Sequence, residues 1–279
     1  MKGLVLPAGG VRGYITTLYL EDFENRTGKQ CYEVFDVIAG TSAGSILACG
    51  LGIGMPAREL RQKYGNLVSD IFGRSNNISR LWSSKYDNNK LIDTLKTVFG
   101  EKQINETLTK VMVFTAQLDP VKTVVYKSWK TDDPIYLTCS KSSAAPTFFE
   151  PIDGEVDGGV WALDPGIETY SELIKLGGSN NRILTVGTGK IQEDVAAKSG
   201  ILHWAKSIVD LLLPLQRMRT NYIMPKIMDN FQEIDIELPE DMSDMDDYEN
   251  IPRMRNLVLD DVKQNYKEYQ WIAEWMTMN

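Results

Sequence analysis

An apolar run that ends in a glycine-framed serine constrains this chain more than any other feature. The run covers residues 34–39, is rich in β-branched and aromatic side chains, and leads into G-T-S-A-G at residues 40–44 and then into small and apolar residues. That order predicts a strand, a sharp turn and a helix, the setting of a nucleophile elbow. Gly40 and Gly44 leave room where the strand meets the helix, and Ser42 is then presented at the helix N-terminus beside backbone N–H groups.

Composition limits the classes of protein that the chain can be. Its 279 residues suit one α/β domain, and 43% hydrophobic and 24% charged residues indicate an ordered globular protein. Lys and Arg number 30 against 38 Asp and Glu, a net charge of −8, which argues against a nucleic-acid partner. The net charge does not exclude a lipid substrate, because a local apolar or basic patch can still dock on a membrane. We see no repeat and no linker, so we expect a single domain over residues 1–279.

The cysteines and the N-terminus indicate the compartment. Cys31, Cys49 and Cys139 are too few and too scattered for a disulfide framework or a zinc site, so we expect buried free thiols in a reducing compartment and no metal. Residues 1–7 lack a long apolar segment, and no window approaches about eighteen continuous apolar residues. These features predict a cytoplasmic protein without a signal peptide or a transmembrane helix.

Strand and helix patterns alternate through the first 190 residues. Where strands end in glycine-rich loops, alternation is typical of a doubly wound sheet with its site at the carboxyl ends of the strands. The two strands nearest the middle of the chain form either a hairpin or two edge neighbours, and the polar segment 73–90 is expected to be an exposed loop. The expected strands are residues 3–6, 33–39, 111–116, 123–129, 156–160 and 181–189. The expected helices are residues 14–28, 43–52, a segment opening at 55–59, 88–99, 138–145 and 167–176.

The last third of the chain has a different character. Residues 199–229 are apolar with interspersed basic side chains, and we expect two core helices broken at Pro214 and Pro225. The alternative is a cap over a pocket or a membrane-facing surface. The acidic segment 237–249 is expected to be a solvated loop. A final helix is expected over residues 256–276, with a buried stripe made of Val258, Val262, Tyr266, Tyr269 and Trp275.

The glycine-rich loop at residues 8–13 has two interpretations. It resembles a dinucleotide-binding G-x-G-x-x-G that has lost its first glycine, and Asp36 lies near the spacing of a ribose-binding acid. Alternatively, Gly9 and Gly10 let consecutive backbone N–H groups point at one developing oxyanion. The elbow favours the second interpretation, because the second strand of a dinucleotide-binding fold does not need G-T-S-A-G.

A nucleophilic serine needs a base, and the chain has one histidine, His203. The order Ser42, Asp157, His203 would fit a triad of the α/β-hydrolase type. Only about two strands precede Ser42, however, and His203 lies beside Trp204 in the apolar stretch. We therefore expect His203 to be a packed or exposed helical residue.

A carboxylate is the remaining base. Asp157 ends an expected strand, and Gly158 and Gly159 after it would let substrate and serine approach. Burial must raise its pKa, because a free Asp titrates near pH 4. Asp153 is a rival four residues earlier, but it lacks the second glycine.

Taken in order, G-G-V-R-G at 9–13, G-T-S-A-G at 40–44 and D-G-G at 157–159 resemble the motifs of patatin-like phospholipases. The resemblance covers about residues 3–190, with a weaker similarity near residues 260–261. It implies a three-layer α/β/α fold with a mostly parallel central sheet. Further similar segments are residues 143–151, 157–162 and 186–189.

The resemblance also implies roles for individual residues. Ser42 would be the nucleophile and Asp157 the general base of a Ser–Asp dyad without histidine. Arg12 either holds the glycine loop or meets a phosphate. The implied oxyanion hole consists of the amides of Gly9, Gly10, Val11 and Ala43. The remaining motif positions are Gly13, Gly40, Gly44, Gly158 and Gly159. Two departures stand out: Ala8 replaces the first of three glycines, and residues 163–165 read L-D-P where N-N-P is common.

These features predict a serine acyl hydrolase that cleaves fatty-acyl esters of lipids in membranes or micelles, without a cofactor. The catalytic core would cover about residues 1–190, with a helical part over residues 199–279. One alternative is an effector of the same fold with low basal activity, switched on by a small molecule or a protein through segments 73–90 and 199–250. A weaker alternative is a dinucleotide-binding protein. The sequence predicts no oligomeric state.

Overall fold

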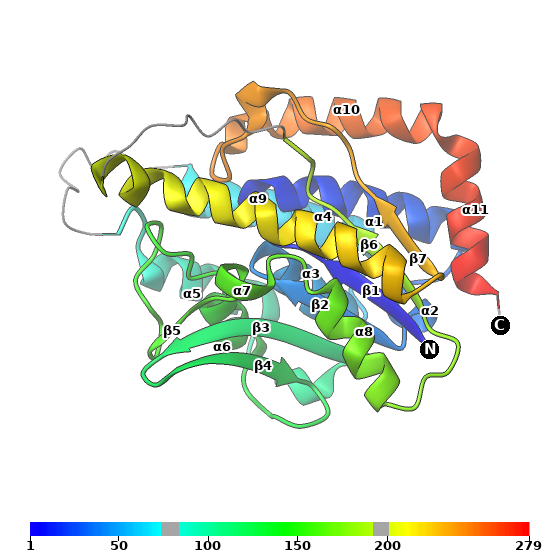
Figure 1. The fold of residues 1–279 in the computed structure, drawn as a ribbon, viewed down its shortest axis with the longest axis horizontal. Coiled ribbons are helices and arrows are strands. Elements are labelled where there is room, and N and C mark those ends of the chain that lie inside the picture. The colour runs from blue at the N-terminus through cyan, green and yellow to red at the C-terminus, as the bar shows by residue number, and fades with distance from the viewer. Residues whose placement is uncertain (74–83, 192–200, 279) are drawn as a thin grey trace.

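The central sheet is mixed and mostly parallel, and helices cover both of its faces (Figure 1). The computed structural model describes residues 1–73, 84–191 and 201–278, with the backbone alone for residues 201–210. The expected three-layer arrangement is confirmed. The strands are β1 (Lys2–Leu6), β2 (Val37–Thr41), β3 (Lys110–Leu118), β4 (Val121–Lys127), β5 (Glu155–Asp157), β6 (Arg182–Val186) and β7 (Phe231–Ile234).

The strand order β4-β3-β2-β1-β6-β7 places the first strand in the interior of the sheet. β1 pairs in parallel with β2 on one side and with β6 on the other, so the chain winds outward in both directions from it. The loops after these strands therefore meet at one edge, the usual position of a site in an open α/β sheet. β3 and β4 form the antiparallel hairpin that was one of the two expectations for this pair.

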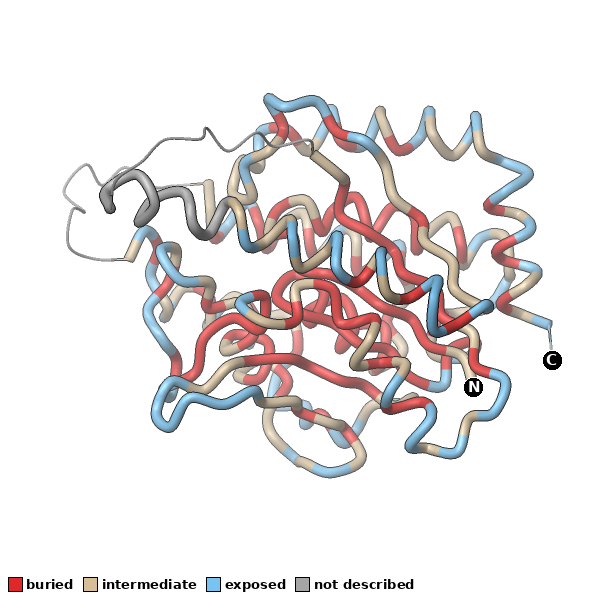
Figure 2. The backbone as a smooth tube through the Cα atoms, in the orientation of Figure 1, coloured by how far each residue is buried: buried red, intermediate tan, exposed pale blue. Residues whose placement is uncertain are grey.

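Alternating residues of β1 separate the two apolar cores. Leu4 and Leu6 point into the larger core, under α1, α3 to α6, α10 and α11, whereas Val5 points into the smaller core, under α7, α8 and α9. In Figure 1, α8 and α9 cross in front of the sheet, and Figure 2 shows its inner strands β1, β2 and β6 almost entirely buried. The larger helices are α1 (Gly13–Thr27), α3 (Ala43–Gly52), α4 (Ala57–Phe72), α5 (Asn88–Phe99), α6 (Ile135–Ser142), α8 (Gly166–Lys175), α9 (Ile201–Ile227), α10 (Ile251–Gln264) and α11 (Tyr266–Thr277). The short helices are α2 (Cys31–Val34) and α7 (Gly159–Ala162).

The expected strand over residues 33–39 is wrong in its first part. Residues 31–34 form α2, and the strand begins only at Val37. Gln30 and Glu33 close a capping box at the start of α2, which satisfies amides that a strand would have left for the sheet. The expected strand at 156–160 also ends early, because α7 begins at Gly159.

The expected break of residues 199–229 into two helices is wrong. α9 is one helix, with Pro214 and Pro225 inside it. Each proline removes one backbone hydrogen bond, but Thr220 and Met224 are fully packed on its inner side and hold the helix against α8. Residues 192–200, and the side chain of His203, lie outside the described part of the chain. The polar segment 73–90 falls partly outside it as well.

The C-terminal region contains more structure than the sequence indicated. β7 extends the sheet beyond β6 and was not expected. The acidic segment 237–249 is not simply a solvated loop, because Met242 is fully buried within it and 3₁₀ turns form at residues 240–242 and 248–250. The single helix expected at 256–276 is two helices that meet at Asn265. Tyr266, expected in the buried stripe, is exposed.

Candidate active site

Ser42 stands at the turn between β2 and α3, and its backbone is in a conformation that L-residues rarely adopt. Its φ is 54° and its ψ is −123°. The turn is possible because a Cβ at Gly40 would overlap the backbone of Gly44, and one at Gly44 would overlap the Leu6 carbonyl. The elbow expected from the sequence is therefore present, and the two glycines permit the close approach of β1, β2 and α3.

Ser142, at the end of α6, holds this strained turn in place through two hydrogen bonds. Its Oγ accepts a hydrogen bond from the Ser42 N–H at 2.9 Å and donates one to the Phe114 carbonyl at 2.7 Å. Ser142 is fully buried. Sequence reasoning missed this residue, because nothing in the local pattern around it points to a contact with the elbow.

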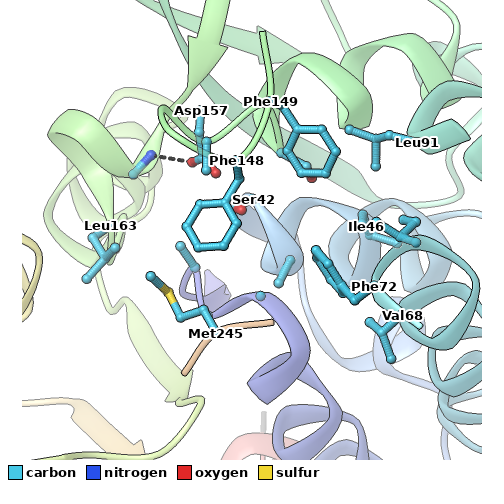
Figure 3. A pocket seen from close by; sticks show the side chains of 18 of the residues that line it. Ser42, Ile46, Val68, Phe72, Leu91, Phe148, Phe149, Asp157, Leu163 and Met245 are labelled. Carbon is cyan, nitrogen blue, oxygen red and sulfur yellow. Dashed lines mark hydrogen bonds between the residues drawn. The ribbon is translucent and has the colours of Figure 1, made fainter. Parts of the chain in front are cut away.

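Asp157 lies beside Ser42 at the end of β5. The Gly159 N–H donates to Asp157 Oδ1 at 2.6 Å, and Ser42 lines the same cavity as this carboxylate. Burial raises the pKa of Asp157 to about 6, although the nearby Ser42 hydroxyl and the Gly159 amide act in the opposite direction. Figure 3 shows Ser42 and Asp157 together in one cavity. The rival Asp153 occupies a turn with a φ of 50° and pairs with Lys141 at 3.2 Å, and it does not line this cavity.

The glycine loop brings two open amides to the same place. Gly9 precedes a 3₁₀ turn over Gly10–Arg12, and the N–H groups of Gly9 and Gly10 donate to no residue in the part of the chain that the structure describes. The Val11 N–H differs, because it donates to the Met245 carbonyl at 2.7 Å. The expectation that Val11 supplies an open amide is therefore wrong for this conformation. Ala43 opens α3, so its amide belongs to the open first turn of the helix.

The peptide unit between Gly10 and Val11 is held from both sides. The Tyr64 hydroxyl donates to the Gly10 carbonyl at 2.6 Å, opposite the bond from the Val11 amide to Met245. Gly10 has a φ of 55°, and a Cβ there would overlap the Met245 carbonyl. Neither Tyr64 nor Met245 could be found from sequence, because both reach the loop from distant segments. Arg12 ends the turn and does not line the cavity.

The two departures from the family pattern contact each other. The Ala8 N–H donates to the Leu163 carbonyl at 2.9 Å. Asp164 is buried next to it, its Oδ1 accepts from the Gly166 N–H at 3.0 Å, and burial raises its pKa to about 7. Thr188, in the glycine-rich turn after β6, donates to the Ala8 carbonyl at 3.2 Å. The loop is therefore held at Ala8 by hydrogen bonds to two other segments, through its N–H and through its carbonyl.

An apolar cavity of about 150 Å³ opens around Ser42. Figure 3 shows Ser42 near its middle, with Leu163 and Met245 on one side and Val68, Phe72 and Leu91 on the other. Aliphatic and aromatic side chains of α3, α4 and α5 make up the second side. The second side of the cavity is thus lined by apolar surface. Its lining includes Ala8, Gly9, Gly10, Ser42, Ala43, Ile46, Tyr64, Leu67, Val68, Ile71, Phe72, Leu91, Phe148, Phe149, Asp157, Gly159, Val160, Leu163, Leu213 and Met245.

The dinucleotide interpretation of the loop is not supported by the geometry. Asp36 precedes β2 and accepts a hydrogen bond from the Lys2 N–H at 2.7 Å, so it lies at the amino end of the sheet. The glycine loop follows β1 at the carboxyl end. A ribose-binding acid would have to stand at the same end as the loop.

Between residues 1–73, 84–191 and 201–278, no helix is long and apolar enough to cross a membrane. Within the same ranges, no group of His, Cys, Asp or Glu could hold a metal ion. The three cysteines are free and buried.

A strained serine between open amides and a buried carboxylate, at the carboxyl edge of such a sheet, is the arrangement of a serine ester hydrolase. The model of the patatin-like phospholipase family matches residues 4–164, more than half of the chain. The chain belongs to the patatin-like phospholipase family, a family of ester hydrolases.

Individual relatives are distant. A cGAMP-activated phospholipase of Pseudomonas aeruginosa is 28% identical over 86% of this chain and 79% of its own length. An intracellular phospholipase A2 of Caenorhabditis elegans is 26% identical over 77% of this chain, which spans only 21% of that protein. Among solved structures, VipD from Legionella pneumophila aligns with 92% of this chain and 66% of its own, at 14% identity and a TM-score of 0.39.

Proposed function

We propose that this protein is a serine acyl hydrolase that cleaves fatty-acyl esters of glycerolipids with Ser42 as nucleophile and Asp157 as general base. One observation carries the proposal: Ser42 and the buried carboxylate of Asp157 line one apolar cavity. The open amides of Gly9 and Gly10 border the same cavity.

Acylation follows from this arrangement. Ser42 Oγ attacks the ester carbonyl carbon while its proton passes to Asp157. The amides of Gly9, Gly10 and Ala43 stabilise the negative oxygen of the tetrahedral intermediate. When the intermediate collapses, the bond to the alcohol breaks and Asp157 returns the proton to the leaving oxygen.

Deacylation repeats the steps with water. Asp157 accepts a proton from the water that attacks the acyl-serine ester, and it later gives the proton back to Ser42. A pKa of about 6 suits both directions, because the carboxylate is ionised at neutral pH yet more basic than a solvated Asp. No step requires a metal or an organic cofactor.

The lining of the cavity favours an acyl chain as the group bound beside the serine. The α3–α5 side offers aliphatic and aromatic surface without a charged side chain. Lipids of membranes or micelles supply such chains. We place the enzyme in the cytoplasm, because all three cysteines are buried thiols.

Domain organisation is part of the same proposal. We treat residues 1–279 as one patatin-like domain with its catalytic core in about residues 1–190. Packing supports this division, because the larger apolar core joins Leu4 of β1 to Met276 of α11. α9 adds Leu213 to the cavity lining from the C-terminal part.

The test compares three chains on two substrates. Wild type, Ser42→Ala and Asp157→Asn are assayed on a short-chain p-nitrophenyl ester and on mixed phospholipid vesicles, with release of free fatty acid as the readout. Loss of release in both variants supports the dyad. Full turnover by Ser42→Ala overturns it.

One contact also favours an activated effector as a second candidate. The Met245 carbonyl occupies the Val11 amide, so one amide of the glycine loop is closed in this conformation. A relative is a cGAMP-activated phospholipase. If this chain responds in the same way, a cyclic dinucleotide titration should raise both its melting temperature and its rate. Unchanged values of both would remove this candidate.

A further inference from the structure

The outward side of α9 is apolar, although it faces away from both cores. Leu212, Leu215, Met218 and Tyr222 recur at helical spacing, and each is between 47% and 68% exposed. We call these four residues the outer face of α9. Figure 2 shows exposed positions recurring along this helix. A surface helix normally turns polar side chains outward, so this face is unusual for a protein surrounded by water alone.

The inner side of the same helix is already used. Thr220 and Met224 are buried, and Gln216 Nε2 donates to the Gly159 carbonyl at 2.9 Å. The outer face therefore cannot rotate into the core without breaking these contacts.

The outer face adjoins the entrance of the cavity. Leu213, next to Leu212, lines the cavity, and so does Val160 of α7, which is itself 45% exposed. α7 packs directly against α9 (Figure 1). Apolar surface thus continues from the outside of the helix into the space beside Ser42.

From residue 211 to its end, this helix carries charges of one sign. Arg219 and Lys226 are exposed beside the outer face, and residues 211–227 contain no Asp or Glu. This contrasts with the chain as a whole, whose net charge is −8. Basic side chains beside an apolar stripe fit the anionic phosphates and the acyl region of a bilayer.

We propose that the outer face of α9 docks on the surface of an anionic lipid bilayer, with the cavity entrance facing the lipid. The proposal rests on the proposed acyl-hydrolase function and adds how a lipid reaches the site. A second copy of the chain fits less well. A twofold contact through this face would bring Arg219 and Lys226 near their own copies and would close the cavity entrance.

The test is vesicle flotation in the Ser42→Ala background, where binding is measured without turnover. The vesicles are phosphatidylcholine containing phosphatidylglycerol. Adding Leu215→Glu and Met218→Glu places two charges on the outer face, and we expect about a tenfold loss of the vesicle-bound fraction. Leu108→Glu is the matched control, because Leu108 is 62% exposed but precedes β3 at the amino end of the sheet.

The same double substitution is then tested in the active chain. Neither residue lines the cavity, so turnover of the soluble ester should stay at the wild-type rate while hydrolysis of vesicle lipid falls about tenfold. Equal flotation of all three chains would overturn the proposal, as would a Ser42→Ala chain that does not float. A dimer that the double substitution dissociates, with flotation unchanged, would assign the face to a second copy. If the wild-type chain hydrolyses neither the soluble ester nor the vesicle lipid while the Ser42→Ala chain still floats, the result would instead count against the hydrolase function.

Discussion

Thr41 and Asp157 occupy successive positions along the same edge of strand β3. Thr41 pairs with Phe114, and Asp157 pairs with the next residue, Thr115. β4 pairs with the same two β3 residues along the opposite edge. β5 therefore pairs with β3 on the edge that β2 uses, just beyond the end of β2. Since Ser42 follows Thr41 directly, the sheet register determines how far the serine lies from the carboxylate.

Activity should depend on the ionisation of Asp157. Its pKa is raised to about 6, and only the ionised carboxylate can accept the serine proton. We expect kcat/KM for a soluble ester to rise about tenfold per pH unit below about pH 6 and to level off above it. A rate measured from about pH 5 to about pH 8 that stays flat would contradict this role.

Asp157→Asn should be inactive but more stable than wild type at neutral pH. The folded pKa is raised from 3.8 to about 6, so the folded state binds this proton more tightly, and the wild type loses stability as pH rises through that interval. The full shift corresponds to about 3 kcal/mol in the free energy of unfolding. Urea unfolding should show a gain of about 1–3 kcal/mol at pH 8 that disappears below about pH 4. If the variant were less stable than wild type at pH 8, the ionised carboxylate of Asp157 would not destabilise the folded state.

Ser142→Ala should lower kcat without changing KM. The substitution removes the acceptor for the Ser42 N–H, so the strained turn loses its fixed orientation while the acyl surface of the cavity is untouched. We expect a fall in kcat of about 10- to 100-fold. Ser140→Ala is the control, because Ser140 is equally buried on α6 but its hydroxyl donates to the Tyr136 carbonyl of its own helix. If both variants lowered kcat equally, Ser142 would contribute to packing and would not position the Ser42 turn.

Gly10→Ala and Gly28→Ala separate backbone strain from a steric clash. Both glycines have positive φ, 55° and 64°, but a Cβ at Gly28 meets open space whereas one at Gly10 overlaps the Met245 carbonyl. Gly28→Ala should cost about 1 kcal/mol of unfolding free energy with normal turnover. Gly10→Ala should cost about 2–4 kcal/mol and abolish turnover. Similar losses in both variants, measured by urea unfolding and ester hydrolysis, would argue against the Met245 contact.

Much of the site could be predicted because its signals are local. Ser42 is indicated by its own flanking glycines, and Asp157 is indicated by the two glycines that follow it. Contacts between distant segments give no such local signal in the sequence. Ser142, Tyr64 and Met245 each reach the site from another element, and no local pattern distinguishes them from ordinary helix or loop residues.

The errors in the fold have similar causes. Cys31–Val34 precedes a real strand, and its apolar content concealed the capping box that makes it a helix. Pro214 and Pro225 break an isolated helix more readily than one whose inner side is anchored by Thr220 and Met224. In each case the local preference was overridden by hydrogen bonds or packing that only the assembled fold supplies.

Because Ser42 and Asp157 are both positioned along β3, the connections between the paired strands can change in length without moving either residue. The hairpin turn at residues 119–120 and the connection at residues 128–133 lie outside the paired register. Insertions there change the length of the path between Ser42 and Asp157 but leave their places on β3 unchanged. Loop length can therefore change while Ser42 and Asp157 keep their relative positions, because pairing with β3 sets those positions and the connecting chain does not.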